Sequence, residues 1–178
     1  MNKISTGFDG LFVIKNNFFN DKRGSFVKLF NCEIFSEKKL NFEIREYYYT
    51  ISKKNVIRGM HFQKPPYDHD KLVHVSNGSI IDVVVDLRQS SKTFGKYFEI
   101  LIDSPDKSLF IPKGFAHGFK ALENNTLIQY FVSSEYNKIM DTGIHYNSFG
   151  YDWNIKNPII SERDLSFDTF NDIKHLFE

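Results

Sequence analysis

The sequence has little of several features that mark particular classes of protein. Its 178 residues include a single cysteine, Cys32, which excludes an intramolecular disulfide and fits a reducing compartment. The formal net charge of +1 at pH 7 offers no concentrated basic surface for nucleic acid or a membrane. No apolar run has the length of a signal peptide near the start or of a membrane span elsewhere. We therefore expect a cytoplasmic protein that binds neither nucleic acid nor a membrane.

Helical periodicity and internal repeats are equally scarce. Helical patterns occur only at 33–39 and 171–177, and no linker divides the chain. Aromatic residues instead make up 16% of the sequence, and strand patterns recur at the short spacing of a barrel or sandwich. The sequence predicts one mainly β domain over 1–178, a cupin or jelly-roll barrel with few short helices; an immunoglobulin-like sandwich is the alternative. The expected strands are 11–14, 42–50, 72–75, 80–87, 97–102, 119–122 and 126–132.

The segment Ile81–Leu87 has the clearest strand pattern. Its alternation places branched apolar side chains on one face and the two aspartates, Asp82 and Asp86, on the other. The segment Ser76–Ser79 just before it predicts a hairpin turn, because its Asn-Gly pair tolerates the positive φ of a tight turn. Ser104–Asp106 predicts a second turn.

Reactive side chains gather in the segments Arg58–Gln63 and Ile111–Phe119, with Lys71 between them. His61 is the first candidate, because a neutral imidazole is the commonest general base near physiological pH. The guanidinium of Arg58 suits phosphate oxygens, and the ammonium of Lys71 suits a developing oxyanion. The alternative for His61 is a structural histidine.

A metal site is the competing interpretation of the histidines. Gln63 stands two residues after His61 where a second ligand would chelate, and His69 lies in a proline-containing loop that holds a ligand poorly. His61 and His117 together give two nitrogens without a nearby carboxylate, a thin coordination set. We therefore expect neither a metal nor a cofactor. His117 and Tyr130 could equally be core residues with satisfied polar atoms.

Several blocks of the sequence form a distinctive set that covers nearly the whole chain: 21–24, 58–63, 71–73, 82–88, 91–95, 111–119, Tyr130, Tyr136, 143–144, 152–153 and 161–164. In their order and spacing these blocks resemble the dTDP-4-dehydrorhamnose 3,5-epimerases. The resemblance implies a metal-free cupin barrel, a homodimer, that inverts carbons beside the 4-keto group of a nucleotide sugar for surface polysaccharide synthesis.

The resemblance also implies a role for individual residues. His61 matches the base, Asp164 the carboxylate that orients it, Tyr130 the phenol on the opposite face of the sugar, and Lys71 the cation near the carbonyl oxygen. The substrate-binding positions that it implies are Arg23, Phe26, Lys28, Glu46, Tyr48, Arg58, His117 and Tyr136.

The positions that bind the nucleotide depart from the family pattern. The usual Gln-x-Asn, which reads thymine, is Glu46-Tyr47-Tyr48 here, and a usual glutamate is Lys28. A carboxylate accepts hydrogen bonds from the donors of guanine but offers no donor to the carbonyls of thymine. This change favours a GDP-linked 4-keto sugar, for which a heptose fits. The alternative is a dTDP enzyme in which Glu46 faces solvent.

Two other functions remain open on the same fold. A sugar-nucleotide ketoisomerase would keep the histidine base without needing Tyr130 opposite it. A non-catalytic nucleotide-sugar-binding cupin would need none of the acid–base groups, and the joint presence of His61, Asp164, Tyr130 and Lys71 argues against it.

Overall fold

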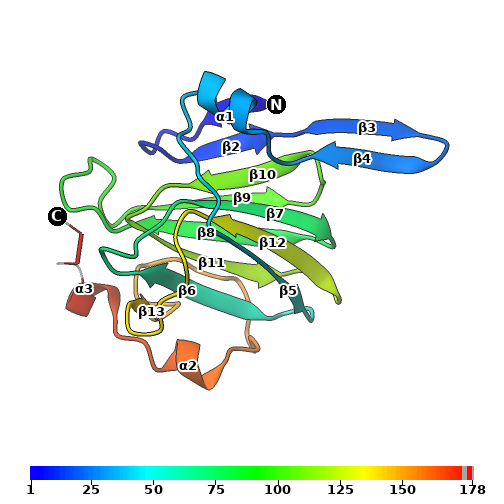
Figure 1. Cartoon of the computed structure of the whole chain (residues 1–178). Helices are drawn as coiled ribbons and strands as arrows, with labels where there is room; N and C mark the ends of the chain where they lie inside the picture. The colour runs from blue at the N-terminus through cyan, green and yellow to red at the C-terminus, as the bar shows by residue number, and fades with distance from the viewer. Residues whose placement is uncertain (174–175, 178) are drawn as a thin grey trace.

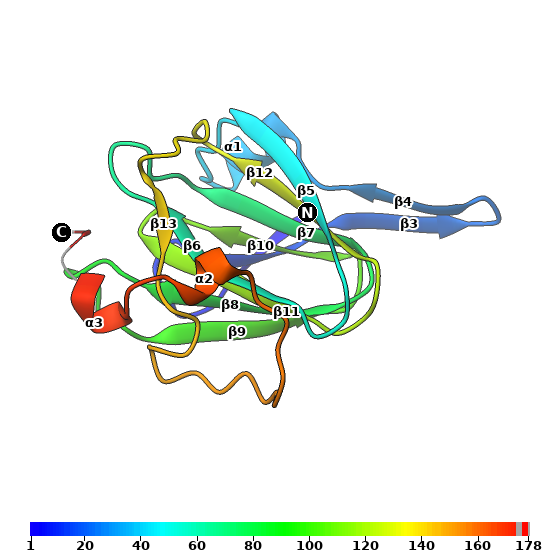
Figure 2. The same cartoon turned by 90° about the horizontal axis from the view of Figure 1, so that it is seen from below.

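Two antiparallel β-sheets face each other and enclose most of the core (Figures 1 and 2). The computed structural model describes residues 1–173 and 176–177. In spatial order the six-stranded sheet holds β1 (Asn2–Ser5), β2 (Phe12–Lys15), β10 (Lys107–Ile111), β7 (Lys71–Asn77), β12 (Thr126–Val132) and β5 (Glu46–Ser52). The five-stranded sheet holds β13 (Asp141–Gly143), β6 (Ile57–Gln63), β11 (Phe115–Ala121), β8 (Ile80–Asp86) and β9 (Tyr97–Ile102).

Three short helices and one hairpin complete the chain. They are α1 (Cys32–Glu37), α2 (Glu162–Leu165), α3 (Phe170–Ile173), and the hairpin of β3 (Asn17–Asp21) with β4 (Gly24–Lys28). Helix α2 lies beside β6 (Figure 2), whereas the hairpin projects away from the sheets (Figure 1). No helix in the described part of the chain is long and apolar enough to cross a membrane. The predicted mainly β barrel is confirmed.

The predicted strands formed with some exceptions. The bounds predicted for β9 and β12 are confirmed, but the expected strand 42–50 begins only at Glu46. Phe42 instead packs edge-on against Phe110 at 5.4 Å between ring centroids, so burial of an aromatic anchor and not strand pairing places it. The sequence analysis did not predict β1, β3, β4, β6, β10 or β13. In β6, Gly59 lowers the strand propensity of the segment. The C-terminal helix ends at Ile173; the rest of its predicted range falls partly on residues 174 and 175, outside the described residues.

The predicted hairpin turn at Asn77-Gly78 is wrong in one respect. Gly78 has the positive φ that a turn requires, +79°, but β7 and β8 belong to different sheets. The turn therefore carries the chain from one sheet to the other. The turn at Ser104–Asp106 does the same between β9 and β10. Turn residues set the local backbone angle, whereas the partner of each strand depends on burial.

The alternation predicted for β8 is confirmed, and both faces of the strand are buried. Val83 and Val85 join the cluster around Met60 and Trp153. The opposite face holds Asp82 and Asp86, both 0% exposed. A buried carboxylate needs hydrogen-bond partners, and Asp86 receives two from the guanidinium of Arg88 at 2.8 Å. Asp82 has its partner in the cavity described below.

A close approach of β6 and β11 sets the geometry of the cavity. Gly59 has φ +127°, and a Cβ there would lie 2.5 Å from the Cα of Gly118. Glycine is therefore required at position 59, both for its conformation and for the space. Beside this close approach, His61 and His117 are direct cross-strand partners, and both line the cavity between the sheets.

Candidate active site

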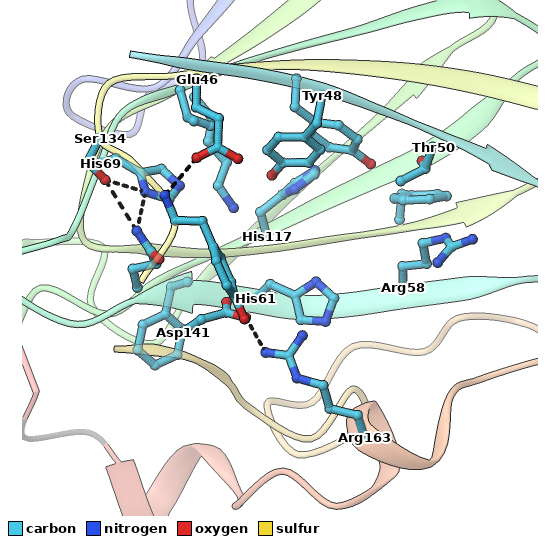
Figure 3. Close-up of a pocket in the computed structure, with 17 residues that line it drawn as sticks. Glu46, Tyr48, Thr50, Arg58, His61, His69, His117, Ser134, Asp141 and Arg163 are labelled. Atoms are coloured by element: carbon cyan, nitrogen blue, oxygen red, sulfur yellow. Dashed lines mark hydrogen bonds and ion pairs between the residues drawn. The ribbon is translucent and has the colours of Figure 1, made fainter. Parts of the chain in front are cut away.

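A cavity of about 300 Å³ opens between the two sheets (Figure 3). Its walls come from β5, β7 and β12 on one side and from β6, β11 and β13 on the other. The predicted site residues that line it are His61, Lys71, Tyr130, Glu46, Tyr48, Arg58, His117 and Tyr136.

Strand register explains why residues distant in sequence meet on one wall. Val132 pairs with Glu46 of β5 and with Lys71 of β7, so these three side chains share one row on the inner face. Tyr130 pairs with Tyr48 in the next row. Their rings stack, with centroids 4.8 Å apart and planes 18° apart. Because side chains alternate between the two faces of a strand, all five of these side chains point into the cavity.

His61 and Asp164 form a hydrogen-bonded pair on the opposite wall. The Nε2 atom of His61 lies 2.9 Å from Oδ1 of Asp164, and Oδ2 accepts the backbone N–H of Gly59 at 3.0 Å. Burial raises the pKa of Asp164, but these hydrogen bonds outweigh burial and leave the pKa below its usual value. An ionised carboxylate only accepts hydrogen bonds, so Nε2 carries the ring proton and Nδ1 is the basic nitrogen.

Helix α2 positions the carboxylate of that pair. Ser161 caps the helix, and its hydroxyl accepts the backbone N–H of Asp164 at 3.1 Å. Asp164 is only 4% exposed, so its side chain is directed from the helix onto β6. A Ser-capped short helix is therefore the local structure that orients the base.

Tyr130 lies on the six-stranded sheet, whereas His61 lies on the five-stranded one. The phenol is 5% exposed, and burial raises its pKa well above the usual value. Tyr130 is therefore protonated at neutral pH and can donate a proton. The cavity thus holds the imidazole of His61 on one wall and the phenol of Tyr130 on the facing wall.

Lys71 is a buried cation without a fixed counterion. It is 7% exposed and makes no ion pair with any residue that the structure describes. Burial lowers its pKa to about 8, and the charges of Asp141 and Asp82 oppose this effect. At neutral pH the ammonium is still charged, so it is available to a negative charge that develops in the cavity.

His117 is held by a buried carboxylate. Its Nε2 lies 2.9 Å from Oδ2 and 3.0 Å from Oδ1 of Asp82. Burial lowers the pKa of His117 and the charge of Asp82 opposes this. The ring is fixed in place beside Tyr130, with centroids 6.1 Å apart, which suits a residue that supports the cavity.

Glu46 is half-buried and lines the cavity. Its Oε2 accepts the backbone N–H of Tyr136 at 2.6 Å, which fixes the segment after β12 across the cavity. Arg58 donates from Nε to the hydroxyl of Ser52 at 3.1 Å. Figure 3 shows Arg58 and Thr50 at one end of the cavity and Glu46 at the other.

Three predicted residues lie elsewhere. Arg23, Phe26 and Lys28 belong to the projecting hairpin (Figure 1) and do not line the cavity of this chain. The side chain of Arg23 is 85% exposed and pairs with Asp21 at 2.7 Å. Phe26 is 58% exposed.

Sequence reasoning missed several lining residues. Asp141 and Arg163 pair at 2.6 Å between Oδ2 and Nη2 and join β13 to α2. Arg163 precedes Asp164 directly, a signal that could have found it, whereas Asp141 had none. His69, in the proline-containing loop before β7, also lines the cavity with Gln63 and Ser134. The described residues contain no group of three or more histidine, cysteine or acidic side chains that could hold a metal ion.

Comparisons with known proteins identify the family of this chain. The sequence model of dTDP-4-dehydrorhamnose 3,5-epimerase matches residues 5–172. The enzyme of that name from Shigella flexneri is 35% identical over 178 residues, covering 97% of each chain. The crystal structure of the Sulfolobus tokodaii enzyme superposes with a TM-score of 0.91 at 37% identity, covering 99% of this chain and 98% of that one.

Another similar solved structure contains a bound nucleotide. The Bacillus anthracis dTDP-4-dehydrorhamnose 3,5-epimerase, crystallised with TDP and PPi, has a TM-score of 0.91 at 31% identity and covers 94% of this chain and 98% of its own. The family match and the fold agree. The chain is therefore an isomerase with the cupin fold, a member of the dTDP-4-dehydrorhamnose 3,5-epimerase family.

Proposed function

We propose that this protein inverts carbon 3, carbon 5 or both of a nucleotide-linked 4-keto-6-deoxy sugar, in the cytoplasm, for surface polysaccharide synthesis. The observation that carries the proposal is that His61 and Tyr130 lie on opposite walls of one cavity. The base His61, oriented by Asp164, stands on one sheet, and the protonated phenol of Tyr130 stands on the facing sheet of the same cavity. Inversion needs removal of a proton from one face of the sugar and return to the other.

The reaction follows from these groups. Nδ1 of His61 takes the proton beside the carbonyl, the C–H electron pair forms a carbon–carbon double bond, and the carbonyl electrons move to the oxygen on carbon 4. The ammonium of Lys71 stabilises that enolate oxygen. Tyr130 then protonates the carbon from the opposite face, and solvent returns the two side chains to their starting protonation. A general base contributes roughly 10²–10⁴-fold and an oxyanion donor roughly 10²–10³-fold.

Solvent exchange tests the proposal. We expect 4-keto nucleotide sugars incubated in deuterated water to gain deuterium at carbon 3 or 5, followed by NMR. His61→Ala should abolish the exchange, whereas Tyr130→Phe should impair inversion more than exchange. His145→Ala, at a histidine that does not line the cavity, is the matched control. A keto group that moves to carbon 3 would indicate the ketoisomerase, and binding without exchange would indicate the silent binder.

For the nucleotide we propose GDP, linked to a 4-keto sugar such as a heptose. One oxygen of Glu46 accepts from Tyr136, and the second could accept from the N–H donors of guanine. The TDP bound to the Bacillus anthracis relative supports dTDP as the second candidate. Titration should show tighter binding of GDP, weakened by Glu46→Gln and not by Glu43→Gln at an exposed site. Equal or tighter binding of dTDP would exclude GDP.

We also propose a homodimer that completes the site. Phe19 and Phe26 are 62% and 58% exposed on the projecting hairpin, and Arg23 and Lys28 beside them do not line the cavity described above. A second copy that receives this hairpin would cover the apolar rings and gain the cations near its nucleotide. Mixing inactive Arg23→Ala and His61→Ala proteins should then restore turnover, because one site of each mixed dimer is intact. No recovery after subunit exchange would contradict a shared site.

A further inference from the structure

The direction of the Tyr136 side chain depends on its backbone, because its ring is not enclosed by packing. Tyr136 follows β12, lines the cavity and is 60% exposed. A flat aromatic ring at the wall of a cavity is a surface on which a nucleobase can stack. The contacts that fix the backbone at this position therefore decide whether the ring faces the substrate.

Two side chains hold the peptide groups on both sides of Tyr136. In the preceding peptide, Oε2 of Glu46 accepts the N–H of Tyr136 at 2.6 Å. The carbonyl of that same peptide, which belongs to Glu135, accepts a hydrogen bond from Nε2 of Gln63 at 3.1 Å. In the following peptide, Oε1 of Gln63 accepts the N–H of Asn137 at 2.6 Å. Because peptide groups are planar, holding both planes fixes φ and ψ of the residue between them, and with them the direction of its side chain.

Gln63 is itself fixed in the barrel. It is the last residue of β6 and only 4% exposed, and its Nε2 also donates to the carbonyl of Tyr67 at 2.9 Å. A carboxamide both accepts and donates, whereas a glutamate would offer no donor and a methionine neither group. Gln63 stands two residues after His61, so both side chains leave the same face of β6, about 7 Å apart along the strand. One strand therefore carries the base and the side chain that holds the Tyr136 backbone.

We propose that Gln63 is a positioning residue for substrate binding, which directs the ring of Tyr136 toward the nucleotide through the backbone of residues 135–137. This inference rests on the proposed function, which supplies a nucleotide sugar. Glu46, proposed above to contact the base, holds the same peptide, and Figure 3 shows Glu46 and Ser134, just before this segment, at one end of the cavity. Gln63 takes no part in proton transfer, so its loss weakens binding and leaves the chemical step.

Gln63→Met tests this role, because methionine keeps the length of the side chain and removes the amide. We expect it to raise the Kd of the free nucleotide, GDP or dTDP, and the KM of the 4-keto nucleotide sugar by about 5–150-fold, the effect of one lost stacking contact. The kcat should change little. Gln129→Met, at a glutamine that does not line the cavity, is the matched control and should change neither constant.

A double variant separates positioning from a general loss of packing. Because Gln63 acts through Tyr136, Gln63→Met should weaken binding no further in a Tyr136→Ala background, whereas effects that multiply would overturn the inference. Gln63→Glu, which loses the donor but keeps an acceptor for Asn137, replaces the methionine variant if urea unfolding shows that the latter is not folded. Unchanged binding in the Gln63 variant, with normal wild-type binding, would overturn this inference alone. A wild type that binds the nucleotide sugar without solvent exchange would instead refute the proposed epimerisation.

Discussion

Replacing Lys71 with methionine should make the protein more stable while removing its activity. Methionine has a similar length and no charge, so it fits the same buried space. The ammonium that it replaces is 7% exposed and has no ion-pair partner among the residues that the structure describes. The native state therefore bears the cost of keeping a desolvated cation, and the variant does not.

The pKa of Lys71 sets the size of this effect. Burial lowers that pKa from 10.5 to about 8. At about 1.36 kcal/mol for each pKa unit, the free energy of unfolding should rise by about 3 kcal/mol in the variant at pH 7. For a chain of this length, that change raises the Tm by about 6–12 °C.

The difference in the pKa of Lys71 between the native and unfolded states also determines how the stability advantage depends on pH. Below pH 8 the amine is protonated in both states, so the native state bears the full cost. Between about pH 8 and 10.5 the native amine loses its proton first, and the cost disappears. The stability advantage of the methionine variant should therefore be complete at pH 7 and lost near pH 10.5.

Urea unfolding at both pH values measures the prediction. Lys54→Met, at an exposed lysine, is the matched control and should change stability little at either pH. Exchange of deuterium into a 4-keto nucleotide sugar should fall about 10²–10³-fold in Lys71→Met. A variant less stable than the wild type, or an advantage of equal size at both pH values, would refute the reasoning.

Three further predictions concern the groups around the base. Asp164→Asn should slow exchange by at least about 10²-fold, because the amide no longer selects the His61 tautomer with a basic Nδ1, and the exposed Asp168→Asn should not. Gly59→Ala should destabilise the fold by more than about 1 kcal/mol in urea unfolding, because its Cβ would meet Gly118 at 2.5 Å; Gly150→Ala, also at positive φ but in open space, should cost less. The rate of exchange should fall as the pH rises through about 8, since Lys71 then loses its charge; a rate that is flat to pH 10 would contradict the assigned role.

Local patterns in the sequence predict where strands form better than they predict which strands pair with each other. The alternation in Thr126–Val132 and Tyr97–Ile102 gave correct strands because side-chain period alone decides which face is buried. Asn77-Gly78 gave the correct turn and the wrong connection, because pairing depends on which sheet buries each strand. The start of β5 was misplaced, because the burial of Phe42 against Phe110 is a tertiary effect.

Some residues of the candidate site could be predicted from the sequence and others could not. The resemblance located His61, Tyr130 and Lys71, which the register brings into one cavity. It placed Arg23 at the nucleotide, yet its hairpin leaves the barrel. The sequence argues against His69 as a ligand because it lies in a proline-containing loop without a strand pattern, yet its side chain lines the cavity.

The orientation of His61 depends on a segment outside the two sheets, because α2 contacts β6 and carries Asp164. Asp164 stands 103 residues after the histidine that it orients, and it follows β13, the last strand of the two sheets. Closure of the two sheets alone therefore leaves the imidazole without its hydrogen-bond partner. The ring gains a fixed orientation only where the segment around α2 packs against β6 and the carboxylate of Asp164 contacts both the ring of His61 and the backbone of Gly59.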